Sequence, residues 1–143
     1  MKKMLKKKSK GFTLVELLIV IIIIGILAGM MMLSTGGATA KAEATKIVSD
    51  MRNMKAAAIM VYADSNAWPT HINSLDNYLD QKPGSLYKIE SEFIMYNATS
   101  TDQKIKDSLK TMATTGGLPL YKCETTSADA KYDATGSLYM PIK

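Results

Sequence analysis

The chain has 143 residues and a formal net charge of +5, from 18 lysine plus arginine and 13 aspartate plus glutamate residues. One cysteine and one histidine exclude an intrachain disulfide, a histidine-based catalytic triad and a multi-histidine zinc site. The positive charge alone would suggest a nucleic-acid partner. However, six lysines lie within residues 1–11, which leaves 12 basic and 13 acidic side chains in the rest of the chain. The sequence therefore indicates no contact with nucleic acid.

An apolar segment follows the lysines. Residues 12–33 contain one ionisable side chain, that of Glu16. A helix of this length, at about 1.5 Å per residue, spans roughly the 30 Å of a bilayer core. Lysines ahead of such a segment hold that end in the cytoplasm, so we expect everything after Leu33 on the far side of the membrane. Because a carboxylate in hydrocarbon is costly, Glu16 needs a partner or a function.

The residues around this glutamate form one uninterrupted motif, Gly11-Phe12-Thr13-Leu14-Val15-Glu16-Leu17-Leu18. The motif resembles the N-terminus of type IV prepilins and of the related pseudopilins of type II secretion. The resemblance implies that a prepilin peptidase cuts after Gly11 on the cytoplasmic side and methylates the new amine of Phe12. It also implies that Glu16 pairs with the Phe12 amine of an adjacent subunit during assembly.

The resemblance further implies a domain organisation and a fold. It divides the chain into a leader peptide (1–11), a transmembrane or filament-core helix (12–37), and an amphipathic stalk helix with a globular head (38–143). The implied fold class is α+β and pilin-like, with the long N-terminal helix packed against a small antiparallel β-sheet. Many pilins close a C-terminal loop with a disulfide, which a chain whose only cysteine is Cys123 cannot do.

The membrane helix departs from the family pattern at one further point. Many pilins carry a proline about two-thirds along this helix, where this chain has Leu33. Glycine costs about 1 kcal/mol relative to alanine inside a helix. We therefore expect the helix to be weakest at Gly25 and Gly29 and, beyond them, at Gly36-Gly37, and we predict Gly25 and Gly29 as sites of local unwinding during assembly.

Other interpretations of the N-terminal region stay open. Small residues follow the apolar run between Ala28 and Ala38, and they would suit cleavage by signal peptidase on the far side of the membrane. An ordinary hydrophobic anchor with an accidental glutamate is a second alternative, and a membrane-anchored binding or enzymatic domain is a third. Within the filament class, a pilus subunit and a secretion pseudopilin are both compatible with the sequence.

Beyond residue 38 the pattern becomes amphipathic. Apolar residues recur at spacings of three and four, which predicts a helix with one covered face. The members of this stalk stripe are Ala44, Ile47, Met51, Met54, Ala58 and Val61. The helix is expected to end before Trp68-Pro69, because a residue that precedes proline is pushed out of the α region.

The remaining segments predict a single small domain of short elements. We expect a helical turn at 73–78, strands at 85–89 and 92–96, and a helix that is capped at Thr101-Asp102 and ends at Gly116-Gly117. Further strands are predicted at 118–124, around Tyr132 and at 138–142, with a turn at 133–136 between the last two. Cys123 is expected to be a small buried hydrophobe, with an intermolecular bridge or a reactive thiol as alternatives.

The sequence offers little chemistry for catalysis or cofactors. Asp129, Asp133 and Ser137 could form an oxygen-rich calcium site, and the major pseudopilin of type II secretion is known for calcium in its C-terminal loop. Because the spacing does not fix such a site, we interpret these residues as a solvated turn and predict no cofactor. His71 and the triplet Asn97-Ala98-Thr99, which fits the N-glycosylation pattern, are expected in exposed polar loops.

The sequence therefore predicts a structural subunit and no enzyme. The precursor would sit in the bacterial inner membrane, be processed after Gly11, and polymerise through its N-terminal helix into a homo-oligomeric filament that faces the periplasm or the cell surface. The implied partners are the prepilin peptidase, an inner-membrane assembly platform, and membrane lipid before assembly.

Overall fold

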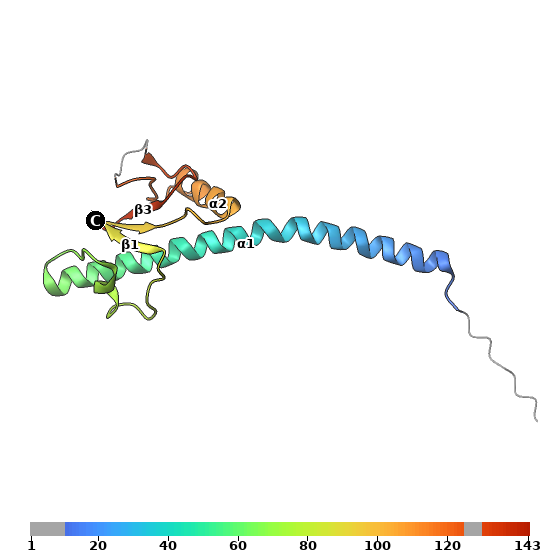
Figure 1. Cartoon of the computed structure of the whole chain (residues 1–143), viewed down its shortest axis with the longest axis horizontal. Coiled ribbons are helices and arrows are strands. Elements are labelled where there is room, and N and C mark those ends of the chain that lie inside the picture. The colour runs from blue at the N-terminus through green and yellow to red at the C-terminus, as the bar shows by residue number, and fades with distance from the viewer. Residues whose placement is uncertain (1–10, 125–129) are drawn as a thin grey trace, which may run out of the picture. The chain divides into compact units, whose positions relative to one another are not determined.

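A computed structural model describes residues 11–124 and 130–143. In chain order it contains α1 (Leu14–Ser65), the 3-10 helix η1 (Ile72–Leu75), β1 (Tyr87–Glu90), β2 (Phe93–Tyr96), α2 (Gln103–Thr114) and β3 (Leu138–Pro141) (Figure 1). The chain divides into two compact units, Met1–Gly36 and Gly37–Lys143, with α1 contributing to both.

The N-terminal unit exposes apolar side chains on every side of its helix. Every large apolar residue from Phe12 to Met32 is exposed, from 46% at Leu18 to 89% at Phe12. Within the described residues, α1 is long and apolar enough to cross a membrane. A helix that is apolar all round is typical of a membrane span or of the centre of an assembly. Gly25 and Gly29 lie inside this helix, and unwinding at these two positions stays a prediction.

In the second unit, α1 buries the predicted stalk stripe. Five of its six residues are fully or almost fully buried, and Val61 packs against them from a partly buried position. The helix ends as predicted, before Trp68-Pro69. Asn66 takes the left-handed conformation with φ 53°, and its N–H donates to the carbonyl of Tyr62 at 2.8 Å, which closes the last turn.

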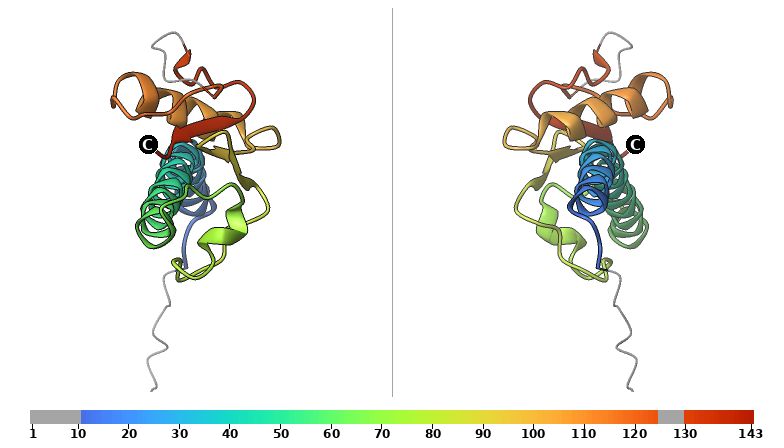
Figure 2. Two further views of the ribbon diagram at one scale, coloured as in Figure 1. Left: turned by 90° about the vertical axis from the view of Figure 1, so that its left-hand side faces the viewer. Right: turned by 90° about the vertical axis from the view of Figure 1, so that its right-hand side faces the viewer.

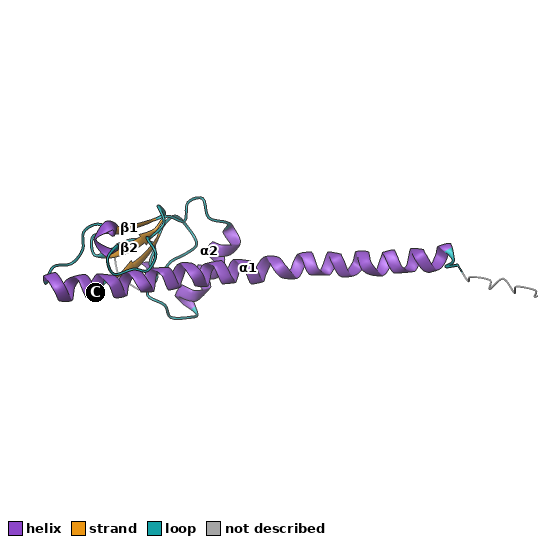
Figure 3. Cartoon of the chain, turned by 90° about the horizontal axis from the view of Figure 1, so that it is seen from below, coloured by secondary structure: helices purple, strands orange, loops and turns teal. Residues whose placement is uncertain are grey.

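The stalk stripe is covered by a three-stranded antiparallel sheet in the order β1-β2-β3 (Figure 3). Side chains alternate along the strands, so the paired residues Ile89, Ile94 and Met140 share one buried face. The β1-β2 hairpin turns through Ser91 and Glu92, both at positive φ, in the manner of a type I′ turn. Figure 2 looks along α1 and shows the strands curving round one side of it.

The helix α2 confirms the predicted cap and stop. The Asp102 carboxylate accepts the N–H of Lys104 at 2.8 Å, and Gly117 adopts φ +65° just after the last turn. Ile105 and Leu109 are buried in the common core. Figures 1 and 2 place α2 on the side of β3 away from α1.

Two of the predicted strands are wrong. The segments 118–124 and around Tyr132 contribute only isolated bridges, from Tyr121 to Lys131 and from Tyr121 to Tyr139. Tyr121 exchanges two backbone hydrogen bonds of 2.8 Å with Tyr139, which continues the sheet by a single residue. Pro119 has no N–H to donate, so the pairing cannot extend in that direction. The last strand, predicted at 138–142, forms as β3.

The buried Tyr132 hydroxyl supplies a stability prediction. Its side chain is fully buried, its oxygen has no hydrogen-bond partner among the described residues, and burial raises the pKa of Tyr132 to about 12, which keeps it protonated. An unpaired buried polar group costs about 1–3 kcal/mol. Tyr132→Phe should therefore raise the free energy of unfolding by about 1 kcal/mol. Denaturant unfolding of the whole chain in detergent measures the change.

The matched control is Tyr96→Phe. The Tyr96 hydroxyl lies 3.1 Å from the Thr101 hydroxyl, so its removal breaks a hydrogen bond. This variant should lose about 1 kcal/mol. An equal loss in both variants would show that the Tyr132 hydroxyl is satisfied in the folded protein.

Candidate processing and assembly site

Residues 11–13 precede α1 and lead directly into its first turn. Gly11, Phe12 and Thr13 are all exposed and lie outside the helix. The predicted scissile bond between Gly11 and Phe12 therefore lies in non-helical, accessible chain. No observation tests the cleavage itself, which stays a prediction.

The Thr13 and Glu16 side chains cap the N-terminus of α1 through reciprocal hydrogen bonds. A single Glu16 carboxylate oxygen accepts the Thr13 N–H at 2.8 Å and the Thr13 hydroxyl at 2.9 Å. The Glu16 N–H in turn donates to the Thr13 hydroxyl oxygen at 3.2 Å. This arrangement is a capping box, in which the residue before the helix and the third helical residue satisfy each other's exposed N–H groups.

The capping box gives Glu16 a partner within its own chain. It turns the carboxylate toward the start of α1, beside the residue whose amine would be created by cleavage. Our sequence interpretation missed Thr13. The signal was present, because a Thr-x-x-Glu spacing ahead of an apolar run is typical of a capping box. The structure thus brings Phe12 and Glu16 to one end of the helix, through a residue that the sequence interpretation did not single out.

Thr13→Val tests the capping box directly. Valine keeps the branched shape but removes the hydroxyl, and the loss of a cap costs about 1 kcal/mol. Hydrogen exchange of the Glu16 amide in detergent micelles should therefore become roughly fivefold faster, the equivalent of that cost. Thr13→Ser, which keeps the hydroxyl, should exchange like the unmodified chain. Equal exchange in the valine and serine variants would show that the hydroxyl does not cap the helix.

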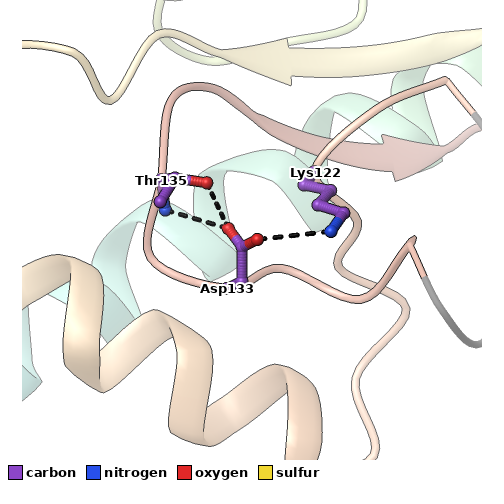
Figure 4. Close-up of polar contacts among 3 residues, drawn as sticks. All are labelled: Lys122, Asp133 and Thr135. Carbon is purple, nitrogen blue, oxygen red and sulfur yellow. Dashed lines mark hydrogen bonds and ion pairs between the residues drawn. The ribbon is translucent and has the colours of Figure 1, made fainter.

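Figure 4 shows the contacts of Asp133, one member of the predicted calcium cluster, in the C-terminal loop. Asp133 accepts a hydrogen bond from the Thr135 hydroxyl and pairs with the Lys122 ammonium at 3.3 Å. The Thr135 hydrogen bond, assisted by Lys122, holds the pKa of this carboxyl below its usual value. Asp129 lies outside the described residues.

Whether calcium binds here is not tested by these contacts, so the expected absence of a cofactor stays a prediction. Calcium takes six to eight oxygen ligands, with carboxylates prominent among them. Within 11–124 and 130–143, no group of three or more histidine, cysteine or acidic residues could hold a metal. The one described carboxylate of the predicted cluster, that of Asp133, is already paired with the Lys122 cation.

The prediction for Cys123 is wrong, because its side chain is exposed. Residues 122–124 leave the sheet edge immediately after the Tyr121 bridge, so all three face solvent. His71 is exposed, as expected. In the Asn97-Ala98-Thr99 triplet the two polar residues are exposed, but Ala98 is fully buried. This triplet is therefore anchored to the core and is only partly the polar loop that we expected.

Comparisons with known proteins agree with the motif and the fold. Residues 6–32 match the family model described as the prokaryotic N-terminal methylation motif. The type II secretion system core protein G of Aeromonas hydrophila is 40% identical over 73 residues, 51% of this chain and 51% of that protein. A fimbrial protein of Neisseria meningitidis is 29% identical over 104 residues, 71% of this chain and 61% of that protein.

The fold has a solved counterpart. The major type IV pilin PilA1 from Clostridium difficile superimposes with a TM-score of 0.53 at 21% identity, over 74% of this chain and 98% of that chain. The chain spans about half the length of the core protein G relatives that it matches. In its motif, its relatives and its fold, this chain is similar to type IV pilins and type II secretion pseudopilins.

Proposed function

We propose that this chain is the precursor of a structural subunit of a type IV pilus-like filament. The observation that carries the proposal is the exposed apolar helix, from Phe12 to Met32, directly behind an intact methylation motif. Such a surface must be covered, first by lipid and later by other subunits. The head in residues 37–143 has its own core and remains in water.

Assembly replaces lipid around the helix with the apolar helices of other subunits. This exchange leaves the apolar side chains buried before and after, so it is nearly neutral in hydrophobic terms. Register must then come from polar contacts, of which Glu16 is the one inside the apolar segment. A charge left unpaired in a low-dielectric interior is strongly destabilising, and Glu16 therefore selects arrangements in which it meets the Phe12 amine of a neighbour.

The partners of this function are the prepilin peptidase, an inner-membrane assembly platform and further copies of the chain. The precursor sits in the inner membrane, and the assembled filament faces the periplasm or extends from the cell surface. No catalytic role is proposed for any residue. A secretion pseudopilin is the second candidate, and it is favoured by the core protein G relatives at 33–40% identity.

Electron microscopy of material sheared from cells tests the proposal. A pilus subunit should appear in long surface filaments that contain this chain, identified by mass spectrometry. A pseudopilin should give surface filaments only when overproduced, and its deletion should block secretion of an exported enzyme. Absence of this chain from any filament under both conditions would refute a filament function.

A further inference from the structure

The helix α1 passes from one compact unit to the other at a pair of glycines. The first unit ends at Gly36 and the second begins at Gly37, while α1 is continuous from Leu14 to Ser65. Gly37 is exposed, and the first residue of α1 that the core of the head buries is Ala40. Among the described residues, this part of the helix therefore lies outside the core that holds the rest of the stalk in place.

The local sequence favours a helix less here than elsewhere in α1. Residues 34–39 read Ser-Thr-Gly-Gly-Ala-Thr, and Gly36-Gly37 is the only pair of adjacent glycines in the helix. Glycine, serine and threonine all have lower helix propensity than alanine, and helices kink at pairs of glycine and serine residues. A Cβ on Gly37 would meet nothing within 4 Å, so packing within the described residues does not require glycine at this position. Its consequence is therefore conformational.

The surrounding solvent decides where this helix can open. Gly25 and Gly29 lie within the apolar segment 12–33, so in a spanning helix they would open in hydrocarbon. In hydrocarbon no water pairs with the N–H and C=O groups that unwinding exposes, and each unpaired group is strongly unfavourable. Gly36-Gly37 follows that segment and reaches the membrane–water interface, where water can pair with the freed groups. In a membrane-spanning subunit, α1 therefore opens most readily at the adjacent glycines.

We propose that α1 bends at Gly36-Gly37 while the subunit spans the membrane, and that Gly25 and Gly29 stay helical at this stage. The bend allows the head, residues 37–143, to turn relative to the bilayer while the apolar helix stays in lipid. A subunit can then present its head to the growing filament at the required angle before its helix leaves the membrane. Unwinding at Gly25 and Gly29, which we predict during assembly, comes later, when other helices replace the lipid. The inference rests on the proposed function and adds a hinge to its membrane stage.

Distances between spin labels test where α1 bends. Labels are attached in pairs to introduced cysteines, in a Cys123→Ser background of the full-length chain in phospholipid nanodiscs. The labelled positions are Val15, Met30, Thr45 and Met60, all exposed and evenly spaced along α1. A straight helix would place neighbouring positions about 22 Å apart in each of the three pairs. Double electron–electron resonance measures the distance distribution of each pair.

The middle pair, 30–45, spans Gly36-Gly37, and the first pair, 15–30, spans Gly25 and Gly29. The middle distribution should be at least about twofold broader than the other two. Gly36→Ala with Gly37→Ala should narrow it to the width of the 45–60 pair, whereas Gly25→Ala with Gly29→Ala should leave it unchanged. Equal widths in all three pairs, a broad first pair, or a middle width that the first double substitution does not change would overturn the bend.

Filament yield tests what the bend does. Gly36→Ala with Gly37→Ala should lower the yield of sheared filaments at least about fivefold while leader removal stays normal, because the head can no longer turn. Gly84→Ala, at a head position equally open around its Cβ, should match the unmodified chain. Filaments at the unmodified level from the double variant would overturn the role of the bend in assembly. Absence of filaments from the unmodified chain would instead refute the proposed function.

Discussion

Glu16→Ala is expected to leave a processed subunit that accumulates in the inner membrane and forms few or no filaments. Insertion should be unaffected or improved, because the change removes the one charge of the apolar segment. Assembly should fail because nothing else in that segment fixes the register. Immunoblots of membrane and sheared fractions, from a strain that expresses only the variant, measure both effects.

Two control variants separate assembly from helix capping. Glu16→Asp keeps the charge with a shorter reach and should be intermediate. Thr13→Val removes the hydroxyl that binds the Glu16 carboxylate but keeps the charge, so its loss of filaments should be smaller. Filaments at the unmodified level from Glu16→Ala would show that this carboxylate does not determine assembly. Equal defects in Glu16→Ala and Thr13→Val would instead assign the role of Glu16 to capping.

Gly11→Leu is expected to block removal of the leader almost completely, whereas Gly11→Ala should be cleaved slowly. A peptidase that recognises a small residue before the scissile bond has no room for leucine. The substrate itself has room, since nothing lies within 4 Å of the position that a Cβ on Gly11 would occupy. A block would therefore arise in the peptidase and not in the fold of this chain.

The processing assay compares precursor and mature bands on immunoblots over time. Folding of the head serves as the control, because the substitution lies outside residues 37–143. Unchanged cleavage of both variants would place the cleavage site elsewhere and favour the alternative of signal-peptidase cleavage after the apolar run.

The helices could be predicted because their information is local. The stalk stripe repeats with helical spacing, and the ends of both helices are marked by Asn66 before Trp68-Pro69 and by Gly117. The prediction of two further strands was wrong for the opposite reason. Residues 118–124 carry β-forming side chains, but whether they pair depends on partners far away in the chain, and only Tyr121 finds them. Cys123 belongs to this segment, and its burial was predicted wrongly for the same reason.

The functional residues could be predicted from the sequence only in part. Glu16 stood out because a carboxylate in an apolar run is rare, and Phe12 followed from the motif. The head also has a groove between Glu43–Met60 of α1 and the segment Tyr78–Tyr87, and it could not be predicted because the fold alone brings these two walls together. Nor could the hydrogen bond from the Tyr87 hydroxyl to the Asp50 carboxylate be predicted, since these residues are 37 positions apart.

The intact mass of the subunit purified from sheared filaments tests the central claim most directly. The account predicts a chain that begins at Phe12 and carries one methyl group on its amine. The leader lysines would then be absent from a filament whose interior is apolar. A subunit that begins near Ala38 or Ala40 would show cleavage by signal peptidase and the loss of the apolar helix, and it would contradict the account.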